Sequence, residues 1–162
     1  MEIKEFKVGI AELSVTSSPH KLITIGLGSC IGIALYDRFT CIGGLAHIML
    51  PDSTAFTNIN NTIKFADLAI PILLKKMEEQ GASIRNIKAK IAGGASMFNF
   101  QDKSMIMDIG NRNGIAVKNT LEKNSILIIA EDIGGNKGRT MIFDTCNGIV
   151  QIKTVGLGIK EI

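Results

Sequence analysis

A cysteine inside a glycine-rich stretch, GLGSCIGIALYD, is the residue of this sequence with the clearest chemical potential. It is Cys30, and His47 stands in the next apolar run along the chain. A neutral imidazole can take the proton of a nearby thiol, or form a thiolate–imidazolium pair with it, and either gives a strong nucleophile at neutral pH. The glycines allow a turn whose backbone N–H groups approach a ligand and stabilise an oxyanion. We therefore predict a Cys–His site, with the N–H groups of Ser29 and Cys30 as candidate oxyanion donors.

The pairing of the two apolar runs that hold these residues decides whether the side chains meet. If Arg38 and Phe39 form the tip of a two-residue hairpin, the numbers of opposed residues sum to 77, which places Cys30 opposite His47. Directly opposed residues of an antiparallel pair share a face, with Cβ atoms about 5 Å apart. Arg-Phe is not a typical pair for such a turn, and a slip of one residue would separate the two faces, so the register is a hypothesis.

The neighbours of Cys30 divide its strand into two faces. Gly32 and Ala34 share the face of the thiol, and their small size predicts open space above the sheet there. The opposite face is expected to pack in the core, because it carries Ile31, Ile33 and Leu35. A lone cysteine or histidine in an apolar strand is more often a packing residue than a reactive group, and packing remains the alternative.

Composition and charge exclude several classes of function. The chain has 162 residues, 46% of them hydrophobic, and no long polar linker, which predicts a single domain over 1–162. Its net charge is only +3, its basic residues are scattered, and it has one Tyr and no Trp, so a nucleic-acid-binding surface is not expected. Charge from the second residue onward, and apolar runs broken by charge or glycine, predict neither a signal peptide nor membrane insertion.

The remaining cysteines and the other histidine are expected to be structural. Three cysteines without a C-x-x-C pair predict free thiols in a reducing cytoplasm. Cys41 and Cys146 lie in no comparable setting, and His20, in a polar connector, is expected at the surface. With two histidines in the chain a His/Cys zinc site is not expected, and no metal or other cofactor is predicted.

Two helices are expected from the spacing of apolar residues. The first covers 62–80 and stops at Gly81, and Pro71 inside it predicts a kink or a late start. The second covers 110–124, with the Asn-Arg-Asn sequence at 111–113 as its expected cap.

Strands are expected elsewhere, separated by turn residues and by polar stretches at 14–20 and 51–61. They cover 3–13, 21–27, 30–37, 41–50, 84–95, 125–136 as a buried strand, and a hairpin within 138–155 that turns at Asn147-Gly148. Because the strands do not alternate regularly with helices, we expect an α/β domain of α+β-like character, with mixed, largely antiparallel β-sheets packed with two main helices.

Six motifs in order give the sequence a resemblance to a known family. They are GLGSCIGIALYD, GGLAHIMLP, KFADLAIPILLKKMEEQGA, KIAGGASMF, IGNRN and EDIGGNKGR. Each is weak alone, but the ordered set closely resembles the CheD family of chemoreceptor glutamine deamidases, over residues 5–155.

The resemblance implies a catalytic set and a reaction. It makes Cys30 the nucleophile and His47 the base, with Thr24, six residues before the cysteine, orienting the imidazole. The implied reaction is hydrolysis of a glutamine side-chain amide to glutamate and ammonia through a thioester, without a metal or cofactor. Taken by itself, Thr24 is an ordinary β-branched strand residue.

The resemblance also implies partners. The substrates would be the helical cytoplasmic domains of chemoreceptors, and a CheC-type phosphatase would bind near the site. We expect a cytoplasmic monomer. The alternatives are a non-catalytic binding regulator of that phosphatase, or another Cys–His hydrolase such as a protease or transglutaminase.

Two further motifs carry milder predictions. Phe98 and Phe100 alternate after a glycine pair and could present one face to a partner, with core packing as the alternative. The stretch EDIGGNKGR lacks the spacing of a phosphate-binding loop and is expected to form a turn near the site, which Arg139 holds unless it contacts acidic substrate.

Overall fold

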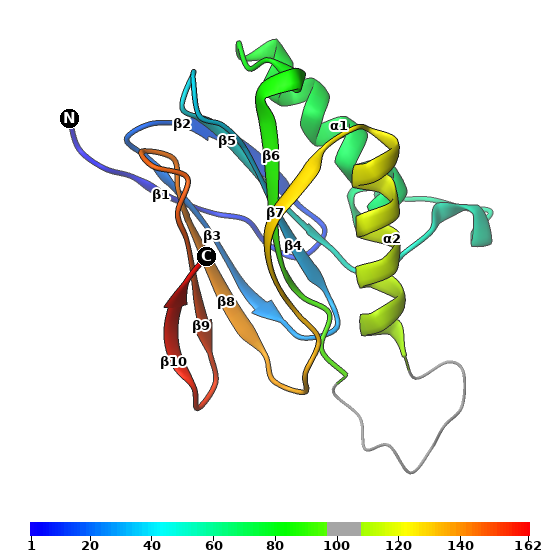
Figure 1. Cartoon of the computed structure of the whole chain (residues 1–162). Helices are drawn as coiled ribbons and strands as arrows, with labels where there is room; N and C mark the ends of the chain where they lie inside the picture. The colour runs from blue at the N-terminus through cyan, green and yellow to red at the C-terminus, as the bar shows by residue number, and fades with distance from the viewer. Residues whose placement is uncertain (97–107) are drawn as a thin grey trace.

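Three layers make up the structure, a computed structural model that describes residues 1–96 and 108–162 (Figure 1). Two α-helices, α1 (Ala66–Glu79) and α2 (Ile109–Lys123), cover one face of a five-stranded central sheet. In order across the sheet, its strands are β2 (Leu13–Ser17), β5 (Ile42–Ile48), β4 (Ile31–Asp37), β6 (Ile87–Gly93) and β7 (Leu127–Ile133). The five-stranded outer sheet covers the other face with β1 (Glu5–Lys7), β3 (Lys21–Leu27), β8 (Arg139–Asp144), β9 (Val150–Thr154) and β10 (Gly158–Glu161).

Alternating side chains give the central sheet two apolar faces. Ile31 and Ile33 of β4 pack in a buried cluster with residues of both helices. Ala34, on the other face, belongs to a second cluster with Met141 and Phe143 of the outer sheet. Most strand pairs are antiparallel, and β1–β3 and β6–β7 are parallel. The predicted fold class, mixed and largely antiparallel sheets packed with two main helices, is confirmed.

The hairpin of β4 and β5 has a wider turn than the sequence predicts. Gly32 pairs with His47, so the numbers of opposed residues sum to 79 and the predicted register of 77 is wrong. Residues 38–41 lie outside the strands, and the Asp37 carboxylate accepts hydrogen bonds from backbone N–H groups within this turn. A shift of two residues keeps every side chain on its predicted face, because strand side chains alternate with a period of two. Cys30, just before β4, is therefore diagonal to His47.

The space predicted above the small residues of β4 is filled by the outer sheet. A Cβ atom placed on Gly32 would lie 2.7 Å from Met141 Sδ and 3.1 Å from a methyl carbon of Leu27. Ala34 is buried in the same cluster. The prediction of open space is wrong, because small residues here let a second layer approach the sheet closely.

The first helix follows its sequence signals. It begins at Ala66, after a 3-10 turn over Thr62–Lys64, which confirms the predicted late start, and Pro71 lies inside it on the exposed side. Gly81 ends it with a left-handed φ of 112°, and the N–H groups of Gly81 and Ala82 bond back to carbonyl groups of the last turn. This is the arrangement that a glycine just after a helix favours.

Several edge strands differ from the prediction. The chain over 3–13 holds only β1 and the start of β2. The strand β2 continues to Ser17 and so covers the first part of the stretch predicted as a connector, 14–20. The strand predicted over 125–136 as buried is β7, an edge strand in which Leu127 is 60% and Ile129 is 54% exposed. The strand β10 was not predicted. Edge strands are held by backbone pairing along one side only, so their apolar pattern is a weaker guide to their position. No helix in the described ranges is long and apolar enough to span a membrane.

The close approach of the two sheets predicts a large stability effect at Gly43. A Cβ atom there would lie 2.5 Å from Cε1 of Phe143, so Gly43→Ala should lower the free energy of unfolding by about 1–3 kcal/mol. Urea unfolding followed by circular dichroism measures this difference. Gly138→Ala, at a position with no atom within 4 Å of the new Cβ, is the matched control and should be close to neutral. Equal stability of the two variants would show that the sheets can separate freely at this point.

Candidate active site

A hydrogen bond between two buried side chains from different sheets forms the centre of the site. The hydroxyl of Thr24, on β3, lies 2.7 Å from Nδ1 of His47, on β5. The threonine side chain is 1% exposed and the histidine 0%. The same hydroxyl donates its proton to the backbone carbonyl of Val8 at 2.7 Å. The structure thus brings Thr24 and His47 together, as the resemblance implied.

These two contacts fix the protonation of the imidazole. A threonine hydroxyl has one proton, and a carbonyl oxygen can only accept, so the proton of Thr24 belongs to the Val8 carbonyl. Nδ1 of His47 must then donate to the hydroxyl oxygen, which leaves Nε2 without a proton. Among the described residues Nε2 is buried and has no hydrogen-bond partner. His47 therefore presents a free lone pair, which is the form a general base requires.

Cys30 lies at the edge of the cluster between the two sheets. It is half-buried, directly before β4, and packs against the outer-sheet cluster on the same face of the central sheet as His47. Burial raises the pKa of the Cys30 thiol, while its own backbone N–H lowers it to a smaller extent. Burial also lowers the pKa of His47 to about 4. Both groups are therefore neutral at pH 7, which favours proton transfer during attack over a preformed thiolate–imidazolium pair.

The turn before Cys30 is anchored through its carbonyl groups. The carbonyls of Gly28 and Cys30 accept hydrogen bonds from the N–H groups of Ala95, at 2.8 Å, and Gly94, at 2.9 Å. Gly93 adopts a left-handed φ of 115°, and a Cβ atom there would lie 2.1 Å from the Cys30 carbonyl oxygen. The glycine pair that ends β6 is thus required for the backbone of β6 to approach the cysteine.

A second glycine turn supports this region, as the sequence predicted. The N–H of Gly134 donates to the carbonyl of Gly93 at 2.9 Å, so the turn after β7 lies beside the end of β6. Arg139, 6% exposed, donates to the carbonyl groups of Asp132 and Gly134. The guanidinium of Arg139 therefore holds this turn. These hydrogen bonds favour a structural role for Arg139 over a contact with acidic substrate.

Sequence reasoning misassigned one buried residue of the site. The helix α2 begins at Ile109, so Asn113 lies inside it and the prediction of a cap at 111–113 is wrong. Asn113 is 0% exposed, and its Nδ2 donates to the carbonyl oxygens of Ser29 and Met49, at 2.9 Å each. An available signal was the position of an asparagine four residues before the buried Val117, on the apolar stripe of the helix.

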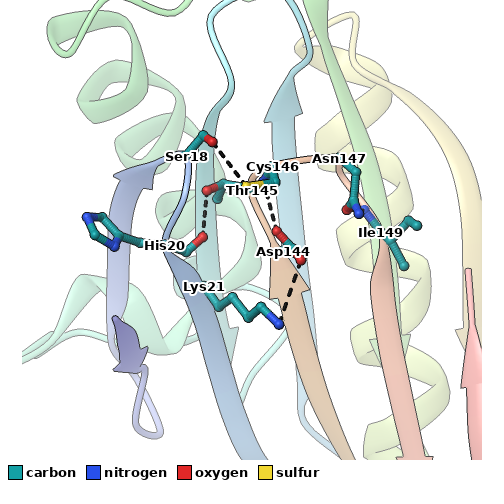
Figure 2. A network of polar contacts seen from close by, with 8 residues as sticks. All are labelled: Ser18, His20, Lys21, Asp144, Thr145, Cys146, Asn147 and Ile149. Carbon is teal, nitrogen blue, oxygen red and sulfur yellow. Dashed lines mark hydrogen bonds and ion pairs between the residues drawn. The ribbon is translucent and has the colours of Figure 1, made fainter. Parts of the chain in front are cut away.

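Cys146, expected to be structural, and His20, expected at the surface, lie in a separate network at the start of β3 and the end of β8 (Figure 2). Cys146 Sγ lies 3.1 Å from the hydroxyl of Ser18, and Thr145 donates to the backbone carbonyl of His20 at 2.6 Å. The imidazole of His20 points away from Cys146 in Figure 2 and accepts a hydrogen bond from the N–H of Lys4. The thiol of Cys146 and the imidazole of His20 therefore form no pair in this network.

Phe98 and Phe100, the predicted partner-binding residues, lie outside the described residues. Within residues 1–96 and 108–162, no group of three or more His, Cys, Asp or Glu side chains is placed to hold a metal ion.

The fold and the site define a three-layer domain with a Thr–His pair and a half-buried cysteine on the same face of the central sheet. Residues 49–154 match the family model described as CheD chemotactic sensory transduction. Over the full length of both chains, the sequence is 72% identical to a Clostridium kluyveri protein and 71% identical to one from Clostridium botulinum strain Hall, each named probable chemoreceptor glutamine deamidase CheD. The chain therefore belongs to the CheD family.

The comparisons cover the site unevenly. The family model matches from residue 49 onward, so Thr24, Cys30 and His47 precede the matched segment and lie within the full-length similarity to the relatives. A solved structure, a Bacillus licheniformis hypothetical protein YfiH, has a TM-score of 0.45 and 15% identity, over 74% of this chain and 49% of that one. The chain thus spans about half of the YfiH structure.

Burial of the neutral imidazole predicts a pH-dependent stability. The pKa of His47 is about 4 in the folded chain and about 6.5 in an unfolded one, so the unfolded state binds more protons between these values. Its contribution is complete above pH 6.5 and is lost as the pH falls toward 4, at up to roughly 1.4 kcal/mol per pH unit. Urea unfolding between pH 4 and 7 measures the slope.

The slope of the free energy of unfolding against pH should become shallower in His47→Gln and should persist in the control His20→Gln. An unchanged slope in His47→Gln would show that this histidine titrates alike in both states.

Proposed function

We propose that this chain is a protein-glutamine deamidase acting on chemoreceptors, with Cys30 as nucleophile, His47 as general base and acid, and Thr24 as the group that orients the imidazole. The observation that carries the proposal is the Thr24–His47 hydrogen bond, which leaves Nε2 unprotonated in a buried site on the face shared with Cys30. The names of the full-length relatives supply the substrate and the reaction.

The first half of the proposed reaction forms a thioester. Nε2 of His47 takes the thiol proton as Sγ of Cys30 attacks the side-chain amide carbon of a substrate glutamine. The amide oxygen becomes an oxyanion, for which the backbone N–H groups of Ser29 and Cys30 are the candidate donors. The imidazolium then gives its proton to the amide nitrogen, and ammonia leaves as the C–N bond breaks.

The second half returns the enzyme to its starting state. A water molecule attacks the thioester carbon while Nε2 of His47 takes one of its protons. The tetrahedral intermediate collapses, the C–S bond breaks, and the proton returns to Sγ of Cys30. The net reaction consumes one water and converts glutamine to glutamate plus ammonia, with no redox change.

Thr24 contributes orientation without charge. The imidazolium that forms during attack is buried, and its Nδ1–H keeps the Thr24 hydroxyl oxygen as acceptor. In a Ser–His–Asp site a carboxylate holds the histidine tautomer and also stabilises the cation. A neutral hydroxyl supplies only the first of these effects in full, so the transfer of the proton back from His47 is strongly favoured.

Further parts of the proposal concern partners and setting. The substrate would be the helical cytoplasmic domain of a chemoreceptor, where conversion of glutamine to glutamate adds a negative charge. A CheC-type phosphatase would be a second partner, and the chain would act in the cytoplasm as a monomer. A purely non-catalytic regulator of the phosphatase would leave the receptor fragment unchanged, and a protease or transglutaminase would cleave or cross-link it.

Substitution of the proposed nucleophile should abolish catalysis. Cys30→Ala should leave receptor-fragment glutamines unmodified, because Cys30 is the thiol that packs between the sheets on the face of His47, and mass spectrometry detects the mass gain of amide-to-acid conversion. Cys146→Ala, which removes an exposed thiol, is the matched control and should keep full activity. Deamidation by Cys30→Ala at the wild-type rate would rule out the nucleophile, and peptide cleavage or cross-linking by the wild type would indicate another hydrolase.

The role of Thr24 predicts a separation between two conservative substitutions. Thr24→Val keeps the shape but removes the acceptor of Nδ1–H, so kcat for deamidation should fall by roughly 10- to 100-fold. Thr24→Ser keeps the hydroxyl and should stay close to wild type. Nitrogen-15 NMR of His47 should show protonated Nδ1 and bare Nε2 at pH 7 in the wild type and in Thr24→Ser. The assignment fails if Thr24→Val retains both wild-type kcat and this tautomer.

A further inference from the structure

Asn113 of α2 bridges the two segments that carry the proposed catalytic residues. Its Nδ2 donates to the carbonyl of Ser29, the residue before Cys30, and to the carbonyl of Met49, two residues after His47, at 2.9 Å each. Both partners are carbonyl oxygens, so the amide nitrogen must face them. Oδ1 of Asn113 is buried without a hydrogen-bond partner among the described residues, so this side chain is only partly satisfied where it lies.

The hydrogen bond to Ser29 fixes the direction of the Cys30 N–H. In a trans peptide the carbonyl of one residue and the N–H of the next point in opposite directions. The Ser29 carbonyl points toward α2, which covers the helix side of the central sheet, so the Cys30 N–H points away from α2. That is the direction of the thiol, which packs toward the outer sheet.

The neighbouring peptide is also anchored through its carbonyl group. The Gly28 carbonyl accepts from the N–H of Ala95, so the N–H of Ser29 is directed away from β6. In the described part of the chain, the structure shows neither N–H donating to a second residue. Two anchored carbonyls thus leave two adjacent N–H groups without a partner in another residue of the described chain.

The base of α2 is placed rigidly against this turn. A Cβ atom on Gly110 would lie 2.4 Å from the carbonyl oxygen of Ala95 and 2.7 Å from that of Gly94. The first turn of the helix therefore contacts the backbone that anchors Gly28 and Cys30. Asn113 extends from this fixed base, so its position relative to the turn is set by backbone packing.

We propose that Asn113 is a positioning residue that holds the Ser29–Cys30 peptide with the Cys30 N–H directed at the oxyanion of the substrate amide. The proposal rests on the proposed deamidase function and adds to it the device that orients the oxyanion donor. Asn113 acts through the backbone of Ser29 and touches no reacting atom. Without it, that peptide can rotate and present its carbonyl oxygen where the donor is needed.

Asn113→Leu tests the proposal, because leucine has nearly the same size and cannot donate. Deamidation of a receptor cytoplasmic fragment should show a kcat lower by about 10²-fold with KM within about twofold, as expected when one oxyanion donor is lost. Alkylation of Cys30 by iodoacetamide displaces iodide at a tetrahedral carbon and forms no oxyanion. Its rate and pH profile should therefore stay close to wild type, which a general distortion of the site would not allow.

Asn119→Leu makes the same substitution on the exposed side of α2 and should keep both rates. If Asn113→Leu does not fold, as judged by circular dichroism, Asn113→Ser removes the same reach with a smaller side chain and should give the same separation of rates. The positioning role is overturned if the wild type is active and the variant keeps its kcat, or if kcat and alkylation fall together. A wild type that does not deamidate the fragment would overturn the proposed function itself.

Discussion

The hydrogen bond that Thr24 donates to the Val8 carbonyl determines the chemistry of the whole site. Because the hydroxyl has one proton, this bond makes its oxygen an acceptor, and the imidazole of His47 must donate through Nδ1. Nε2 is then the only basic atom left in the pair. A contact with a backbone carbonyl on the N-terminal side of the chain thus decides which nitrogen of a histidine on another sheet can act as a base.

The position of the pair between two sheets has an electrostatic consequence. Burial lowers the pKa of His47 to about 4 and raises that of the Cys30 thiol, so neither group is charged at rest. A neutral thiol is a weaker nucleophile than a thiolate, and proton transfer must accompany attack on the substrate. A substrate side chain that enters the site would displace the remaining water around Cys30. Because both groups are neutral, this step would not have to separate an ion pair.

The helix layer and the end of β6 supply the frame for Cys30, the proposed nucleophile. Glycine residues at the end of β6 and at the start of α2 allow three backbone segments to approach one another closely around the turn before Cys30. Larger residues at Gly93 or Gly110 would collide with carbonyl oxygens, so these positions couple helix, strand and turn. Asn113 adds side-chain hydrogen bonds to this frame and connects it with the end of the strand that carries His47.

Much of the fold and the candidates for the site residues follow from the sequence alone. The strands β3, β4 and β5, the late start of α1 and its glycine stop are encoded in local periodicity and in residues with special backbone preferences, and those predictions are correct. The shared face of Cys30 and His47 was predicted correctly despite a register error of two residues, because side chains alternate with a period of two. Thr24 was singled out by resemblance, since a β-branched strand residue has no distinguishing local signal.

Only the tertiary structure decided the tautomer of His47, the neutral state of His47 and Cys30 and the hydrogen bonds of Asn113. These properties depend on hydrogen bonds between segments far apart in the chain and on removal of water by a second sheet, and neither is recorded in local spacing. The same reason explains the wrong prediction of open space above Gly32, because the outer sheet that fills it comes from distant strands. Sequence determined which residues are candidates for the site, and packing determined which nitrogen of His47 carries the proton and which carbonyl groups near Cys30 are anchored.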